Sequence, residues 1–464
     1  MSDLAASSLT IWDPFITLWQ ILTNGGWLVI LGAFLVGFWW WYVIHIKLSY
    51  SGKIDYVLLA IDVPKDNEQS PKAVEHIFSQ LHGILKSGDL IQRYVAGYNQ
   101  MGFAFELVSI DGYIQYLVRT PTNYRDLVES AIYAQYPDAE ISEATDYTEN
   151  IPHEYPDDEY DMYGFEMKLT NKQVYPIRTY PEFEHSLSQE FKDPMAALLE
   201  MMSRLQVGEQ VWLQLNVYPA SDKIWREEGK ALIKKLVGAK SANGKSGMVS
   251  QVGQGVSESI TASLMPIGAD SDNKVENRWP TLMQHLTPSE RSIVEAIGIK
   301  LSKLGFFCKI RLIYLGKKNV YNTRTRIQAI MGTIKQFNSQ DLNGFKQDKK
   351  TRTRAVYPPI KSIIDWRIKR RRKKIMLGYK YRSILRGRNQ FVLNIEELAS
   401  IWHFPVLTVK APLVQKTESK KSEPPTSLPL EGAQIPIGPE EEVEEAKTAV
   451  PTEEKTPANL PFVE

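Results

Sequence analysis

The 464-residue sequence predicts an α+β protein that follows a single transmembrane helix. Residues 27–46 form an uncharged apolar run. Residues 54–150 show the order β-α-β-β-α-β, which is typical of the ferredoxin-like fold. Residues 160–340 alternate strand and helix patterns again and predict a second α+β unit. Residues 411–464 are rich in Pro, Glu, Lys and Thr with few aromatics, so we expect a disordered acidic tail.

The run from Trp27 to Ile46 predicts the transmembrane helix. As a helix it rises about 30 Å, the thickness of the hydrocarbon core of a bilayer. Asp3 and Asp13 are the charges before it, so the basic start of a signal peptide is missing. The first Lys residues follow the run, and the positive-inside rule therefore predicts a single-pass membrane protein with its N-terminus outside and residues 47–464 in the cytoplasm. Four aromatic side chains near the end of the run are expected at the membrane interface: Trp39, Trp40, Trp41 and Tyr42.

Residues 1–26 are expected to lie outside the membrane. They place Trp12, Phe15, Trp19 and Leu22 on one helical face. A short helix with such a face lies in the plane of the interface. We therefore expect an outer interfacial segment before the span.

Local signals mark the elements of the first cytoplasmic unit. Ser70 and Pro71 supply an N-cap and a first helical residue. Asp111 and Gly112 form a two-residue hairpin signal between two alternating runs. We expect a strand over 56–63, a helix from 71, strands on both sides of 111–112, a second helix starting at Thr120-Pro121 and a short strand near 139–142.

The second unit is interrupted by a low-complexity segment. Residues 238–279 are rich in Gly, Ser, Asn and Ala, which predicts a flexible insertion. Structure is expected to resume at Thr287, because Thr287 and Glu290 have the spacing of a capping box with Pro288 at the first helical position. A basic helix and a short helical motif then fill residues 341–410.

The basic run, residues 366–388, holds eleven Lys or Arg and no acid, with aromatics interleaved. Such a cluster suits the phosphates of nucleic acid. It suits anionic lipid equally well, and it also fits an acidic protein surface. The sequence leaves these alternatives open. The residues expected to make the contact are Arg367, Lys369, Arg370, Arg371, Arg372, Lys373 and Lys374.

Several patterns resemble catalytic or metal sites without meeting their requirements. Gly244-Lys245-Ser246 ends like a phosphate-binding loop, but Ala239 stands where such a loop needs its first glycine. The acidic stretch 154–161 lacks the spacing of a calcium loop and is expected to be a solvated turn. Cys308 is the single cysteine of the chain. We therefore expect no enzyme, no cofactor and no metal.

The motif at 394–405 predicts a short capped helix. Asn394 and Glu397 have capping-box spacing, and Leu398 and Ile401 give the helix an apolar face. His403-Phe404-Pro405 ends it. We expect this motif to dock a partner protein through Glu397, Trp402, His403, Phe404 and Pro405.

Four segments carry a family resemblance: "DYVLLAIDVPK", "YKYRS", "NIEELASIWHFP" and "VKAP…PPTSLP". With the N-terminal anchor, they resemble the N-terminal half of a bacterial family of membrane-anchored HerA/FtsK-like ATPases, which are related to the coupling proteins of conjugation and type IV secretion. The resemblance implies that the membrane is a bacterial inner membrane. The resemblance covers roughly 50–430 and is most specific at Glu396–Pro405. In that family the helix and a Pro-Pro linker lead into the ATPase domain. No phosphate-binding loop follows Pro429 here, so the resemblance implies the accessory half without its motor.

The sequence thus predicts a non-enzymatic bitopic scaffold. Its cytoplasmic domains would dock a separate P-loop ATPase of a DNA-transfer or type IV secretion-like system. The alternative hypothesis is a membrane-tethered module that binds nucleic acid through the basic run.

The departure of Gly244-Lys245-Ser246 from a phosphate-binding loop is testable. We expect the purified full chain and its Lys245→Ala variant to show the same ATP hydrolysis rate, because an unfixed lysine stabilises no transition state. The rate is measured as phosphate released from ATP and Mg²⁺. A lower rate in the variant would contradict the prediction.

Overall fold

A computed structural model of the chain describes residues 19, 22–64, 67–86, 88–149, 151–152, 154–183, 193–237, 286–354 and 360–406. The fold over these residues is mixed α+β, as predicted. Several expected features lie outside them. These are most of the outer interfacial segment, the insertion over 238–279 with Lys245, and the acidic tail over 411–464.

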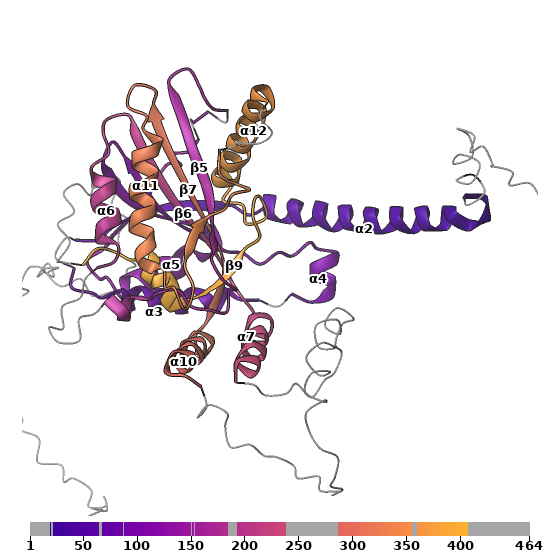
Figure 1. Ribbon diagram of the computed structural model, residues 1–464, viewed down its shortest axis with the longest axis horizontal. Helices are drawn as coiled ribbons and strands as arrows, with labels where there is room; N and C mark the ends of the chain where they lie inside the picture. Colours follow the sequence, from indigo (N-terminus) through magenta and orange to yellow (C-terminus); the bar gives the residue numbers. More distant parts are fainter. Residues whose placement is uncertain are drawn as a thin grey trace, which may run out of the picture. The chain divides into compact units, whose positions relative to one another are not determined.

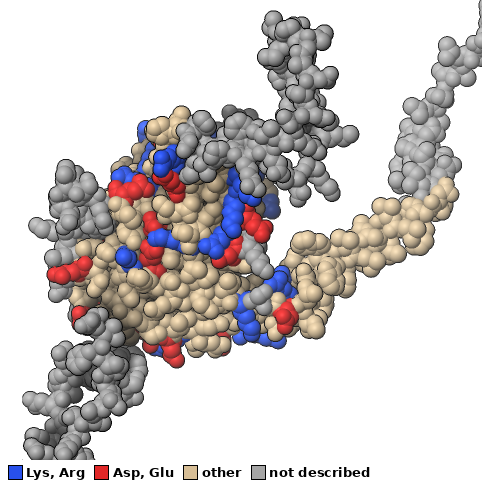
Figure 2. All heavy atoms as spheres, turned by 90° about the horizontal axis from the view of Figure 1, so that it is seen from below, with Lys and Arg blue, Asp and Glu red and all other residues tan. Residues whose placement is uncertain are grey.

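The predicted transmembrane run lies in α2 (Trp27–Gly52), which continues past Ile46 and follows the short turn η1 (Leu22–Gly26). None of the α2 residues is buried. By length and composition, Thr23–Gly52 can cross a membrane; near an N-terminus, a signal sequence has a similar composition. Figure 1 shows α2 as a long unbroken helix, and Figure 2 shows its surface free of charged side chains over most of its length.

The first half of the body is ferredoxin-like, as predicted. Its elements are β1 (Tyr56–Asp62), α3 (Pro71–Leu81), η2 (His82–Ile84), α4 (Leu90–Tyr94), β2 (Phe103–Ile110), β3 (Tyr113–Pro121), η3 (Thr122–Tyr124), α5 (Arg125–Tyr133) and β4 (Glu140–Glu143). The strands are antiparallel in the order β4-β1-β3-β2. Asp111 and Gly112 form the hairpin turn with φ angles of 54° and 88°, as a type I′ turn requires.

One expected element of this half differs. Thr120 and Pro121 do not start a helix, because they still pair with Val57 and Tyr56 of β1. The helix α5 begins only at Arg125, after the turn η3. The sequence correctly predicted a change from strand to helix here. It placed the start of the helix about one helical turn too early.

The second half repeats the same topology. Its elements are β5 (Tyr160–Leu169), η4 (Tyr180–Phe183), α6 (Ala196–Ser203), β6 (Glu209–Pro219), α7 (Asp222–Leu236), α10 (Pro288–Ser302), β7 (Gly305–Lys317), α11 (Thr323–Ile334), η6 (Lys335–Phe337) and β8 (Phe345–Gln347). Its strand order, β8-β5-β7-β6, matches the ferredoxin-like order of the first half. The helices α7 and α10 lie in the connection between β6 and β7, where the first half has the β2–β3 hairpin turn. The capping box of Thr287 and Glu290 that starts α10 is confirmed.

The two halves share one nine-stranded sheet. The edge strands β2 and β6 pair antiparallel, from Phe103 with Val217 to Ile110 with Gln210. The short strand β9 (Phe391–Asn394) adds to β7 and leads directly into α13 (Ile395–Ile401). The predicted α+β units are therefore joined through backbone hydrogen bonds.

Each face of the sheet has its own helical cover. In β6, Val211 and Leu213 face the main core under α3, α5, α6, α11 and α13, while Trp212 faces the other side. That other side is covered by α12 (Lys361–Lys380) through Ile375 and Tyr379. Figure 1 shows α11 and α12 on opposite sides of the strands. A smaller cluster lies between α7 and α10.

The end of the described chain completes the main core. The ring of Phe404 lies 5.1 Å from Tyr116, 5.0 Å from Tyr136 and 5.1 Å from Trp402, measured between centroids. Because Tyr116 belongs to β3, this contact ties the last described residues to the first half. The motif at 394–405 is thus part of the fold.

We expect Phe404→Ala to destabilise the full chain by about 3–5 kcal/mol, because a buried aromatic side chain leaves a cavity. Urea unfolding in mild detergent, followed by tryptophan fluorescence, measures the change. The control Trp366→Ala alters an exposed ring of α12 and should cost about 0.5 kcal/mol or less. Equal effects of the two substitutions would contradict the placement of Phe404.

Candidate functional site

Residues 366–380 of the predicted basic run lie on α12, and part of the run pairs with acidic residues of the same chain. Lys369 and Lys373 contact the Glu154 carboxylate at 3.0 and 2.8 Å, and Arg372 contacts Asp161 at 2.9 Å. The hydrogen bonds and charges of the two lysines lower the pKa of Glu154 to about 2. The acidic stretch 154–161 therefore faces the basic helix α12. The opposite charges of the two segments are the feature of the sequence that is consistent with this contact.

The other basic residues of the run have different surroundings. Arg371 donates hydrogen bonds to the carbonyl oxygens of Arg352 and Arg354 at 3.2 and 2.7 Å. The guanidinium of Arg370 lies 5.3 Å from the ring of Trp366. Arg367 also interacts within the chain.

A pocket of about 440 Å³ lies beside α12. Arg371 and Lys374 line it together with Lys350 and Arg388, opposite Glu166 and Asp348. Some basic residues of the run thus hold α12 on the body, and others line a partly open basic pocket.

Beneath α12, a row of buried polar side chains crosses the sheet. Glu106 of β2, Gln214 of β6, Arg311 of β7 and Glu166 of β5 are each at most 2% exposed. The Gln214 amide donates to Glu106 at 2.8 Å, and Arg311 donates to Gln214 at 3.2 Å and to Glu166 at 3.0 Å. The row connects the two halves of the sheet. Buried polar groups of this kind are stable only when their hydrogen bonds are made, and here they are.

The segment "YKYRS" is anchored to this row through Arg382. Its guanidinium donates to both oxygens of Glu106, at 2.9 and 3.2 Å, and also pairs with Asp146. Burial opposes the charge of Arg382, but the charge of Glu106 and the hydrogen bonds of Asp146 raise its pKa. Burial would raise the pKa of Asp146, yet Arg382 holds it below its usual value. The hydroxyl of Tyr379 lies 2.7 Å from that of Tyr147.

The loop that follows, residues 383–388, is held through its backbone. Arg311 donates to the carbonyl oxygens of Ser383 and Arg386, and Lys309 donates to those of Ile384 and Arg386. Burial lowers the pKa of Lys309 to about 8. Gly387 has a φ of +100°, and a Cβ there would collide with the Glu166 carboxylate, which accepts the amide of Arg388. The buried charges position this loop.

The five residues predicted to dock a partner lie mostly inside the protein. Glu397, Trp402, His403 and Phe404 are at most 2% exposed, and Pro405 is half-buried. Glu397 completes the predicted capping box with Asn394, and its carboxylate contacts Lys300 at 2.9 Å. These side chains therefore hold the fold together. The short apolar pattern was equally consistent with a core element, and only the packing distinguishes the two.

His403 links the motif to residues just before α6. One ring nitrogen lies 2.9 Å from the Asp193 carboxylate and the other 2.8 Å from the Ala399 carbonyl oxygen. Both partners are acceptors, an arrangement that a doubly protonated ring satisfies. Burial would raise the pKa of Asp193, but the charge of His403 holds it low. Val406, the last described residue, donates its amide to Asp193 at 3.3 Å.

The predicted interface aromatics all lie on α2 and share its exposure. Trp39, Trp40 and Trp41 are more than half exposed, and Tyr42 is half-buried. Within the described residues, no group of three or more His, Cys, Asp or Glu side chains is arranged to hold a metal ion.

The sequence did not predict the polar row, because Glu106, Glu166 and Arg311 have the pattern of solvent-facing positions in half-exposed strands.

We expect Arg382→Met to lower the free energy of unfolding by about 3–5 kcal/mol, because it leaves buried Glu106 and its partner Asp146 without their cation. Adding Glu106→Gln should recover part of the loss, as coupled residues do. Urea unfolding of the full chain in detergent measures both. Lys373→Met, at the exposed pair with Glu154, is the matched control and should cost much less. A loss from Arg382→Met no larger than from the control would exclude the network as a stabilising element.

Residues 57–417 match a family model described as "Domain of unknown function (DUF8128)". The match starts within β1 and includes both ferredoxin-like halves, α12 and the motif at 394–405. No curated protein matches the chain at a significant level. Neither finding links the chain to HerA/FtsK-like ATPases, so that resemblance stays a prediction. Since most of its length matches the family model, the chain belongs to the DUF8128 family.

Proposed function

We propose that this chain is a non-enzymatic membrane adaptor. The helix α2 anchors it in a bacterial inner membrane, with the N-terminus outside and the tandem body in the cytoplasm. The body docks a separately encoded P-loop ATPase of a DNA-transfer or type IV secretion-like system. The observation that carries the proposal is α2 itself: an apolar helix of 26 residues of which none is buried.

The exposure of α2 supports a lipid environment. A helix that is apolar on all sides is stable in the core of a large protein or in a bilayer. Because α2 has no buried residue, the body supplies no such core for it. The first lysines, Lys47 and Lys53, lie at its C-terminal end, which supports the cytoplasmic side for the body.

The pairing of the buried charges supports a scaffold. The carboxylates of Glu106, Glu166 and Glu397 each contact a buried cation. A carboxylate whose oxygens are occupied by such contacts positions neighbouring groups, as Glu166 does when it accepts the backbone amide of Arg388. These groups therefore favour a rigid platform over acid-base chemistry.

The contacts that hold Pro405 and Val406 support an interaction beyond residue 405. The carbonyl oxygen of Pro405 accepts the Asn67 side-chain amide at 3.2 Å, and the Val406 amide donates to Asp193. In the ATPase family that the sequence resembles, the corresponding motif leads into the motor domain. A fixed exit would direct the following segment toward a docked ATPase.

The nucleic-acid alternative has one favourable observation. Lys350, Arg371, Lys374 and Arg388 line the pocket beside α12 and outnumber the two acids there. Against it, Glu154 and Asp161 already pair with Lys369, Lys373 and Arg372. The adaptor is therefore the function that we favour.

The adaptor predicts a defined partner. We expect the tagged full chain, purified from its native membranes in mild detergent, to recover a P-loop ATPase identified by mass spectrometry. A variant that ends at Pro405 keeps α2 and the core, and should stay in the membrane fraction but lose the ATPase. Recovery of no ATPase by the full chain, or equal recovery by the shortened variant, would refute docking through this segment.

A further inference from the structure

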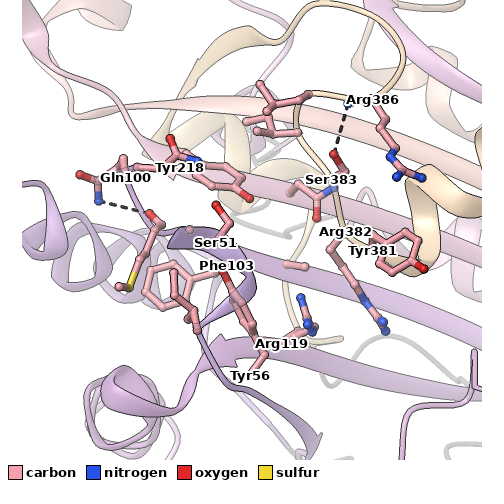
Figure 3. A pocket seen from close by; sticks show the side chains of 18 of the residues that line it. Ser51, Tyr56, Gln100, Phe103, Arg119, Tyr218, Tyr381, Arg382, Ser383 and Arg386 are labelled. Atoms are coloured by element: carbon pink, nitrogen blue, oxygen red, sulfur yellow. Dashed lines mark hydrogen bonds between the residues drawn. The ribbon is translucent and has the colours of Figure 1, made fainter. Parts of the chain in front are cut away.

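A cavity of about 380 Å³ lies where the C-terminal end of α2 meets the sheet. Its walls come from α2, β1, β3, β6 and the loop after α12. Figure 3 shows the hydroxyl groups of Ser51 and Tyr218 turned toward the middle of this cavity. The residues that matter for its chemistry are Ser51, Tyr56, Arg119, Asn216, Tyr218 and Arg386.

The cavity carries unbalanced positive charge. Among the described residues that line it, three are arginines and none is acidic. Arg382 is neutralised by Glu106 and Asp146. Arg119 and Arg386 form no ion pair with a described residue; they lie 4.0 and 5.0 Å from the rings of Tyr56 and Tyr381. Burial and the nearby charge of Arg382 lower the pKa of Arg119, as expected for a cation that lacks a close carboxylate.

A buried acceptor in the wall lacks a donor. Asn216 is 1% exposed, and its Oδ1 accepts no hydrogen bond from any residue that the structure describes. Its orientation is set by its amide, which donates to Gln214 Oε1 at 3.0 Å, the oxygen that also accepts from Arg311. Buried polar atoms are nearly always paired. A ligand with a hydroxyl group would supply the missing donor.

The place of the cavity along α2 suggests the source of that ligand. If the hydrocarbon ends at Ile46, then Leu48 and Gly52, which line the cavity, lie about 3 and 9 Å beyond it at 1.5 Å per residue. The two polar layers bring a bilayer from about 30 Å to about 40–45 Å, so each is about 5–7 Å thick. Leu48 therefore lies at the depth of the lipid headgroups, and Gly52 lies just beyond them. This step rests on the proposed anchoring by α2.

The helix α4 supports the same depth independently. Leu90, Ile91 and Val95 are 73, 74 and 65% exposed. The ring of Tyr94 stacks on Trp39 of α2 at 6.0 Å, about 10 Å below Ile46. Exposed apolar side chains at this level fit an element that inserts about 5–10 Å into the membrane surface. The same side of the body would then rest on the bilayer.

We propose that this cavity binds the headgroup of an anionic phospholipid that carries free hydroxyls. Arg119 and Arg386 bind the phosphate, and Asn216 Oδ1 accepts a headgroup hydroxyl. A soluble polyol phosphate shares this chemistry, but it lacks the acyl chains that α2 and α4 would hold at the cavity mouth.

Soluble short-chain lipids test the cavity. We expect dihexanoyl-phosphatidylglycerol to raise the unfolding temperature of the full chain in neutral detergent, and dihexanoyl-phosphatidylcholine to leave it unchanged. In Arg119→Gln the apparent Kd for the anionic lipid should rise by about tenfold or more, because a charge-assisted hydrogen bond is lost. Arg386→Gln provides the same test if Arg119→Gln fails to fold. Lys369→Gln, the same charge change on α12, is the matched control.

The outcomes separate the cavity from the anchor. Equal shifts with both lipids, or no effect of either arginine substitution, would overturn the headgroup site. Stabilisation by glycerol 3-phosphate as strong as by the anionic lipid would overturn a lipid source and leave a soluble phosphate ligand. Flotation with liposomes tests the anchor separately, since a wild-type chain that does not float refutes the membrane function whatever the cavity binds.

Discussion

The structure depends on the antiparallel pairing of β2 with β6. Each half of the body would end at an unprotected edge strand, and pairing these edges over eight residue pairs makes one continuous sheet. An exposed edge is a site of unspecific association, so this pairing also removes a liability. It places Glu106 next to Gln214, and the polar row that crosses the sheet exists only because the two halves meet there.

The polar row fixes the position of Arg382 and of the loop at 383–388. Arg382 pairs with Glu106 on one side of the junction, while Arg311 and Lys309 bind the carbonyl oxygens of the loop at 383–388 on the other. A buried ion pair contributes less to stability than its short distances suggest, because both charges lose their hydration. Here the buried charges hold the loop at 383–388 in one position. That loop forms a wall of the cavity at the end of α2.

The helix α2 and the motif at 394–405 are held by opposite kinds of contact. The helix α2 meets the body through a few aromatic contacts, such as Tyr50 with Tyr98, and remains exposed along its length. The motif at 394–405 is buried among aromatic rings and charges, and the described residues end directly after it. The adaptor that we propose would use this combination, because a rigid body would relate the position of the membrane to the segment after residue 405.

The sequence by itself determined the features whose causes are local. The apolar run of α2, the Asp111-Gly112 turn and the capping boxes at Thr287 and Asn394 depend on side chains within a few residues of one another. Only the tertiary structure decided which polar and apolar side chains are exposed to solvent and which are buried in the core. Glu106 meets Arg382 across 276 positions and Glu166 meets Arg311 across 145, so no local spacing could predict either pair. The burial of the residues predicted to dock a partner has the same cause, because an apolar helix face looks the same in the sequence whether the fold or a partner covers it.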